Sequence, residues 1–205
     1  MVRLMKPGQR NGRRKKPAIG TPPPTPVRKN RPASLGGLII PVLIFIITVL
    51  SYLPALQNEF VNWDDESFLV ANPLYRGLGW PQFRWMFTTC YLSSCMPLTW
   101  MTYSLDFVFW GMNPVGYHLT SLLIHAFNAV LFFFVSLRLL RLSVSSSNGS
   151  QQLPIRLAAG FAALFFALHP LQVEVVAWAL GREMAVAGFF FFLNLICYLK
   201  IGRAH

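Results

Sequence analysis

The stretch LGGLIIPVLIFIITVLSYLPAL, residues 35–56, decides the fold. It contains no charged side chain, and a helix of this length rises about 33 Å, which exceeds a hydrocarbon core of about 30 Å. The whole chain is 54% hydrophobic and only 12% charged, whereas soluble domains carry about 25% charged residues. The sequence therefore predicts an all-α membrane protein.

Three further apolar stretches bring the expected total to about four transmembrane helices. They lie at about residues 115–137, 155–168 and 185–199. The last two are shorter than the roughly 17–25 residues that a span requires. We therefore expect either that these spans extend into residues 169–184, or that this connection is a partly buried helix at the membrane.

The charged residues predict the orientation. Ten of the eighteen Lys and Arg residues precede residue 32, in a Pro-rich stretch without acids, so residues 1–34 are expected to be a disordered cytoplasmic tail. The net charge of +11 then does not indicate a nucleic-acid partner, because it is not spread over a folded face. All seven acidic residues lie in or beside the loops 57–114 and 169–184, which we expect on the outer side.

The first outer loop, residues 57–114, is too long for a simple connection and is rich in aromatic residues. Turn signals such as Asn72-Pro73 and Trp80-Pro81 divide it into short pieces. This pattern predicts short helices that lie in the membrane interface. Cys90 and Cys95 also lie in this loop, where an oxidising compartment would permit a disulfide between them.

The acidic segment NWDDES, residues 62–67, follows the first span. Asp64, Asp65 and Glu66 are open to two interpretations. A partly desolvated carboxylate near an acceptor proton serves as a general base, or the group binds a cation. Alternatively, the three acids complement the dipole at the start of a helix.

The second outer loop contains HPLQVE, residues 169–174, followed by Arg182 and Glu183. One interpretation is an interfacial ion pair between Arg182 and either Glu174 or Glu183. The other places His169, Glu174 and Arg182 around the same outer cavity as Asp64, with Arg182 suited to bind a phosphate through two hydrogen bonds.

The remaining polar residues do not predict a required metal site. His118 and His125 share one face of the second span, and His125 is expected to be a packing residue, while His118 lies nearer the outer end. Asp65 and its neighbour could offer metal ligands together with His169 and Glu174. These ligands are split between two loops without a chelating spacing, so neither a required metal nor a cofactor is expected.

Several motifs occur in an order that resembles a known family: FVNWDD at 60–65, NP at 72–73, WGMNPVGYH at 110–118 and HPLQVE at 169–174. Together they resemble the N-terminal part of the polytopic membrane glycosyltransferases of the GT-C class, in the branch fused to tetratricopeptide repeats. That branch includes the eukaryotic transmembrane O-mannosyltransferases and many bacterial proteins. The resemblance covers about residues 38–199.

The resemblance implies transfer of a sugar from a polyprenyl-phosphate donor to a hydroxyl of a protein or glycan, on the outer or luminal face of the membrane. It implies a multi-pass protein of the bacterial inner membrane, or of the ER membrane in a eukaryote. Asp64 would be the catalytic base, with Asp65 beside it. The substrate-binding residues would be His118, His169, Glu174 and Arg182.

Two departures from the family pattern bear on activity. Bacterial relatives tend to show Glu-Arg-Lys-Asp where this chain has Gly181-Arg182-Glu183-Met184. Family members also have more spans and then the repeat region, so residues 35–205 are expected to be a partial GT-C-like domain. We therefore expect a fragment that is inactive alone. The alternative is a non-catalytic membrane anchor or interaction module derived from the family.

Overall fold

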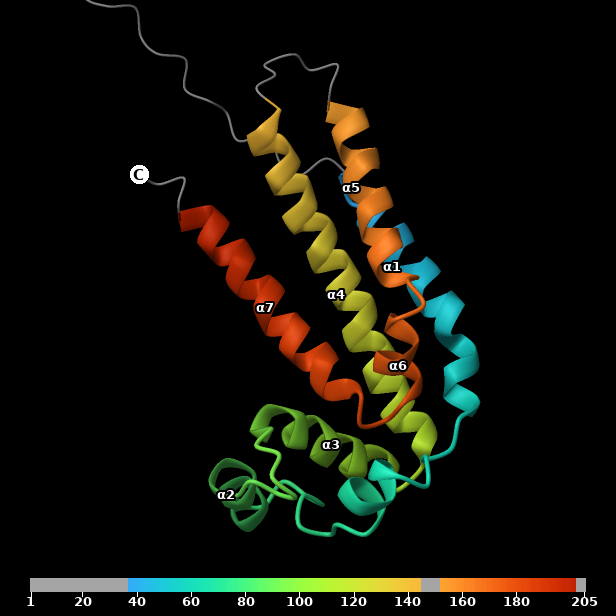
Figure 1. The fold of residues 1–205 in the computed structure, drawn as a ribbon, viewed down its shortest axis with the longest axis vertical. Helices are drawn as coiled ribbons and strands as arrows, with labels where there is room; N and C mark the ends of the chain where they lie inside the picture. Colours follow the sequence, from blue (N-terminus) through green and yellow to red (C-terminus); the bar gives the residue numbers. More distant parts are fainter. Residues whose placement is uncertain (1–36, 145–151, 202–205) are drawn as a thin grey trace, which may run out of the picture. The chain divides into compact units, whose positions relative to one another are not determined.

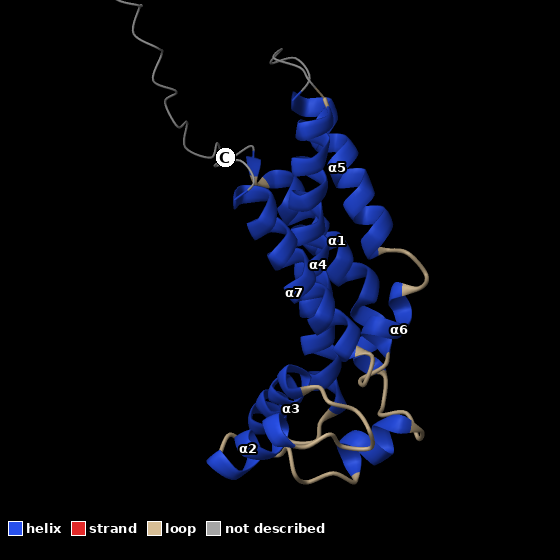
Figure 2. Ribbon diagram, turned by 60° about the vertical axis from the view of Figure 1, so that its left-hand side comes forward, coloured by secondary structure: helices blue, strands red, loops and turns tan. Residues whose placement is uncertain are grey.

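The computed structural model describes residues 37–144 and 152–201, so the predicted tail 1–34 lies outside the described residues. All of them belong to one compact unit, Ala33–His205. Within these two ranges the secondary structure is helical and no strand occurs (Figure 2). The prediction of an all-α membrane protein is therefore confirmed.

Three helices are long and apolar enough to cross a membrane. They are α1 (Ile39–Tyr52) with its continuation η2 (Leu53–Gln57), α4 (Pro114–Ser143) and α7 (Arg182–Ile201). The helix α4 is central and packs against α1, α7 and α5 (Gln152–Ala167) (Figure 1). Small residues permit a close approach of α4 and α5, because the alanines at their contact are fully buried: Ala129, Ala159, Ala163 and Ala167.

The third expected span is shorter than a bilayer requires, as its sequence predicted. The helix α5 has 16 residues, a rise of about 24 Å against a core of about 30 Å. The last span, in contrast, begins at Arg182 rather than 185 and reaches 20 residues, so it extends into the second outer loop as expected. That loop also contains the short helix α6 (Gln172–Ala177), with Val175 and Val176 buried.

The first outer loop folds over one end of the bundle as the π-helical turn η3 (Glu66–Val70), α2 (Trp80–Thr88) and α3 (Pro97–Trp110) (Figure 1). Its core is aromatic and is centred on Trp100, which is fully buried. Its ring neighbours come from the whole length of the loop: Phe68, Tyr75, Trp85, Tyr91 and Tyr103. The loop is thus a folded cap and not a simple connection.

Local sequence signals set the ends of these helices. The helices α2, α3 and α4 each have a proline in the first turn, where its missing N–H costs nothing. Asn113 caps α4 by accepting a hydrogen bond from the Val115 amide at 3.1 Å. A Cβ at Gly116 would collide with the Trp110 ring, so glycine is needed where α3 turns into α4. Cys90 and Cys95 form a disulfide that closes the turn between α2 and α3. The sequence had left this disulfide open as a possibility.

The surface of α2 carries a stripe of aromatic side chains. Trp80, Phe83 and Phe87 are exposed and stack in sequence along the helix. This spacing places all three on one face. The stripe fits the predicted position of the loop helices at headgroup level.

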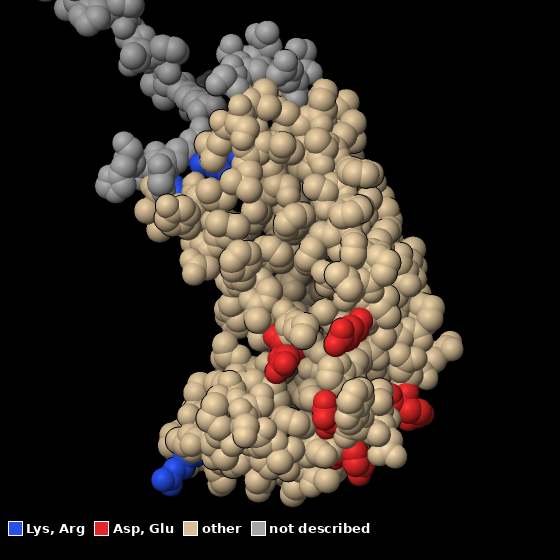
Figure 3. Space-filling view, viewed as in Figure 1, with Lys and Arg blue, Asp and Glu red and all other residues tan. Residues whose placement is uncertain are grey.

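The acidic side chains gather at one end of the bundle. Figure 3 shows the acidic side chains gathered over the lower half, near the cap, with basic side chains at the upper end near the last turn of α7 and one more at the lower left of the cap. The acidic positions are the seven in the two outer loops, whereas Arg138, Arg141 and Lys200 lie near the opposite ends of α4 and α7. The candidate site is therefore sought at the acidic end.

Candidate active site

Asp65 joins the two outer loops. Its side chain is fully buried, and its carboxylate accepts hydrogen bonds from the Val61 amide at 2.9 Å and from the Leu180 amide at 3.0 Å. Burial raises the pKa of the Asp65 carboxyl above its usual range, and the two amide donors and the nearby His118 oppose that rise. Because both carboxylate oxygens are engaged within the protein, Asp65 fixes the loop that precedes α7 against the NWDDES segment.

Asp64 has a different environment from its neighbour. Its side chain is only partly buried. Among the described residues it makes neither a side-chain hydrogen bond nor an ion pair within the distances that define one. Its carboxylate is therefore available to an incoming group, while the backbone beside it is held by Asp65.

Arg182 is fully buried at the start of α7 and is the centre of a polar cluster between α3, α4 and α7. Its Nη1 pairs with the Asp106 carboxylate at 2.5 Å and donates to the Thr102 hydroxyl at 3.2 Å. Its Nε donates to the Ser121 hydroxyl at 3.1 Å, and its Nη2 donates to the Tyr117 carbonyl at 2.5 Å.

The guanidinium also lies 4.4 Å from the centre of the Tyr103 ring, in a cation–π contact. The expected ion pair of Arg182 with Glu174 or Glu183 is wrong, because both acids are exposed and the guanidinium faces inward to Asp106. All three nitrogens of Arg182 are used inside the protein, so the geometry favours a structural role. Phosphate binding by Arg182 stays a prediction.

The two histidines of α4 differ as expected. His125 is a packing residue: its Nε2 lies 3.0 Å from the Ala167 carbonyl and its ring meets Tyr52 edge to face. His118 is fully buried near Asp65, with the backbone of Val176 and Glu59 beside its ring.

His169 and Glu174 lie apart from this cluster in the contacts of the structure. The His169 ring packs on Phe165, and its Nδ1 accepts a hydrogen bond from the Leu171 amide at 3.3 Å. Glu174 is exposed on α6. The structure thus brings together Asp65, His118 and Arg182, while the substrate-binding roles of His169 and Glu174 stay predictions. Among the described residues, no group of three His, Cys, Asp or Glu side chains could hold a metal.

A hollow opens beside the cluster, between α3 and α7. Figure 3 shows the surface indented on the left, between the cap and the bundle. The pocket here has a volume of about 520 Å³, and Glu183 is the charged residue in its lining. A second, apolar pocket of about 400 Å³ continues between α3, α4 and α7. Both have sides formed by Leu98, Val186 and Phe190. A molecule with an apolar chain could lie in this hollow.

Asp106 and Tyr103 are functional candidates that the sequence analysis did not single out. Asp106 is an acid within the otherwise mostly apolar helix α3, and a buried charge in such a helix requires a partner. That signal was present in the sequence. The partner, Arg182, could not be identified from it, because the residues lie 76 positions apart.

Comparison with known proteins identifies the relatives of this chain. Protein O-mannosyl-transferase TMTC2 of Homo sapiens is 35% identical over 111 residues, which are 52% of this chain and 11% of the relative. Its Xenopus laevis counterpart, tmtc2, is 34% identical over 107 residues, with the same coverage. Human TMTC1 is 30% identical over 160 residues, which are 73% of this chain and 16% of that protein.

This chain is a homologue of the protein O-mannosyl-transferases. This confirms the resemblance that the loop motifs show to GT-C membrane glycosyltransferases with tetratricopeptide repeats. The protein O-mannosyl-transferases are much longer, since the chain spans only about a tenth to a sixth of the relatives it matches. No family model matches the chain. No solved structure matches it either.

Proposed function

We propose that this chain forms the acceptor-activating part of a membrane glycosyltransferase, which moves a sugar from a polyprenyl-phosphate donor to a hydroxyl on a protein. The observation that carries the proposal is the pair Asp64–Asp65. One carboxylate is engaged by two backbone amides and the other is left available at the end of the bundle. The names of the relatives support the reaction class.

In the proposed reaction Asp64 is the general base. Its carboxylate takes the proton of the acceptor hydroxyl, whose oxygen attacks the anomeric carbon of the sugar. The bond between that carbon and the phosphate oxygen breaks, and the phosphate leaves with the electron pair on its lipid. A carboxylate is suited to this step when it is held beside the acceptor and partly shielded from water.

Asp65 is proposed as a positioning residue and not as a second base. Its hydrogen bonds to Val61 and Leu180 hold the NWDDES backbone, so Asp64 approaches the acceptor from a fixed position. The hollow between α3 and α7 is the proposed place for the donor lipid, because its walls are mainly apolar. The predicted roles of His169 and Glu174 would then require an acceptor or donor that reaches α6.

The proposed orientation places the cap on the outer or luminal side, with the basic ends of α4 and α7 in the cytoplasm. Two observations support it. All seven acids lie toward the cap end, whereas Arg138, Arg141 and Lys200 lie at the opposite end (Figure 3), as the positive-inside rule expects. The Cys90–Cys95 disulfide lies in the cap, and disulfides persist in oxidising compartments. A eukaryotic source would make this the ER lumen.

The test is a hybrid enzyme in which residues 37–201 replace the corresponding part of human TMTC2. Membranes containing the hybrid are supplied with a radiolabelled polyprenyl-phosphate mannose and a threonine-containing acceptor protein. We expect label in the acceptor, dependent on the donor lipid. A hybrid that inserts and is expressed like the parent but transfers no sugar would instead favour the non-catalytic module.

A further inference from the structure

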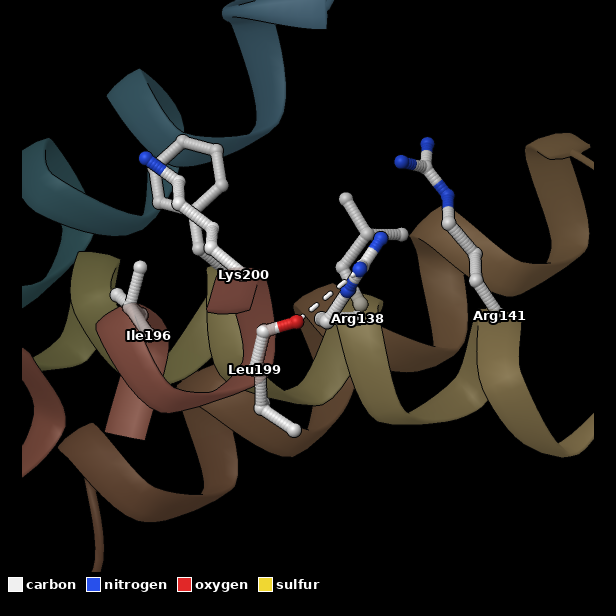
Figure 4. A pocket seen from close by; sticks show the side chains of 7 residues that line it. Arg138, Arg141, Ile196, Leu199 and Lys200 are labelled. Carbon is white, nitrogen blue, oxygen red and sulfur yellow. Dashed lines mark hydrogen bonds between the residues drawn. The ribbon is translucent and has the colours of Figure 1, made fainter. Parts of the chain in front are cut away.

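A second pocket lies at the opposite end of the bundle from Asp65. It has a volume of about 520 Å³ and lies near the last turns of α4 and α7. Three of its lining residues are cationic: Arg138 and Arg141 from α4, and Lys200 from α7. The other four are apolar: Phe134, Leu137, Ile196 and Leu199. Figure 4 shows the three charged side chains extending to the same side of the two helices.

The positive charges of this pocket have no counter-charge among the described residues. All seven acids of the chain lie at positions 59–66, 106, 174 and 183, at the other end. The ion pair found within the described residues is Arg182–Asp106. Arg138 and Arg156 both lie near enough for their charges to act on Arg141. Like charges brought together at a partly buried site repel one another unless an anion is shared between them.

Ordinary helix chemistry accounts for part of this arrangement. Basic side chains favour helix C-termini, and they collect on the cytoplasmic side of spans. Arg138 satisfies a carbonyl of α7, since its Nη2 donates to the Leu199 carbonyl at 3.1 Å (Figure 4). Its Nε, however, is buried without a partner among the described residues. Arg141 and Lys200 have no ion pair there either, so donors remain available for a ligand.

We propose that this pocket binds the phosphate headgroup of an anionic phospholipid from the surrounding membrane. The cationic residues supply donors for the phosphate, because Arg and Lys pair strongly with phosphate oxygens. The apolar residues supply walls for the first carbons of the acyl chains, which a soluble anion would not need. The pocket also lies where two membrane-spanning helices end, at the depth of lipid headgroups.

The bound lipid would join α4 to α7 at the end opposite the cap. The Arg138–Leu199 hydrogen bond is already a direct link between the two helices there. A phosphate held between Arg141 and Lys200 would add a second link and would offset their repulsion. In the proposed orientation this end faces the cytoplasm, whose leaflet is rich in anionic lipids.

The test is native mass spectrometry of the purified protein in detergent, titrated separately with phosphatidylinositol and with phosphatidylcholine. Wild-type protein is expected to retain phosphatidylinositol and not phosphatidylcholine. The variant R141Q/K200Q should weaken phosphatidylinositol binding by about fivefold per charge removed. Arg84 lies exposed on α2 at the other end, so R84Q is the matched control and should bind like the wild type.

The double variant leaves the Arg138–Leu199 contact intact, so it should fold like the wild type, and its melting temperature without lipid checks this. Equal retention of phosphatidylcholine would overturn the proposal. So would unchanged phosphatidylinositol binding by R141Q/K200Q. A third result would also overturn it: millimolar inorganic phosphate displaces the bound lipid, and the protein shows no preference among lipids. That result would show a site for a soluble anion.

Discussion

Arg182 and Asp106 form a buried ion pair, 2.5 Å between Nη1 and the carboxylate, that joins the start of α7 to α3. The guanidinium has further contacts with Ser121, Thr102 and the Tyr117 carbonyl on α3 and α4. Three segments that are remote in sequence therefore meet at one cation. The pair fixes the cap on the bundle and sets the position of the loop that Asp65 also holds.

Removing one partner of this pair should be strongly destabilising, because the other charge would be left buried and unpaired. We expect D106N and R182Q each to lower the free energy of unfolding by about 3–5 kcal/mol. Thermal unfolding in detergent measures this. The control is E183Q, which changes an exposed acid beside Arg182 and should cost no more than about 0.5 kcal/mol. If D106N were as stable as E183Q, the structural role of the Arg182–Asp106 pair would be contradicted.

An apolar replacement of the whole pair gives a sharper test of the same cluster. The variant D106L/R182M removes both charges together, so no unpaired charge remains. We expect it to recover most of the stability that either single variant loses, since buried ion pairs are often no better than packed apolar residues. If the double variant lost as much unfolding free energy as the two single variants lose together, the cost would come from lost packing and not from an unpaired charge.

The ionisation of Asp65 should make the stability of the cap depend on pH. Burial raises the pKa of this carboxyl in the folded state above its unfolded value of about 3.9. The stability that follows from the raised pKa is present below about pH 4 and is lost as the pH rises through the folded pKa. The variant D65N cannot ionise, so its stability should decline less between pH 4 and pH 7 in thermal unfolding.

The partly exposed neighbour provides the control for this pH experiment. D64N leaves the Asp65 carboxylate buried and hydrogen-bonded, so it should show the same decline with pH as the wild type. Equal slopes in the wild type and D65N would show that the Asp65 carboxyl does not set the pH dependence.

Thiol labelling should report both the disulfide and the compartment of the cap. The chain has three cysteines, of which Cys90 and Cys95 are bonded and Cys197 is not. After denaturation, a maleimide should modify one thiol in protein from non-reduced membranes, and three after reduction. Three reactive thiols without reduction would place the cap in a reducing compartment and would contradict the proposed orientation. Gel shifts with a polymer-linked maleimide count the thiols.

The sequence was sufficient for the helices and insufficient for their polar contacts. Apolar length predicted the spans because a bilayer requires internally hydrogen-bonded backbone, a condition that depends on local sequence. Proline and asparagine signals likewise predicted the breaks in the first outer loop, for example at Trp80-Pro81, where α2 begins. The short third span was predicted as well, because the expected stretch at about 155–168 lies close to α5, which ends at Ala167 just before His169-Pro170.

The site was harder to predict because its contacts join distant segments. Asp65 meets Leu180 across 115 positions, and nothing in the NWDDES segment distinguishes the buried acid from the available one. His169 was expected near Asp64 because both lie on the outer side, but a shared membrane face does not fix which direction a side chain takes. The packing of the His169 ring on Phe165 decides that direction.

The central claim is that Asp64 activates the acceptor, and the direct measurement is sugar transfer by the hybrid enzyme carrying D64N. We expect a loss of at least about a hundredfold in turnover, as is typical when a general base is removed, with membrane insertion and unfolding temperature unchanged. E66Q, which alters an exposed acid two residues away, should retain activity within a factor of two or so of the wild type. Turnover of D64N equal to that of E66Q would contradict the account.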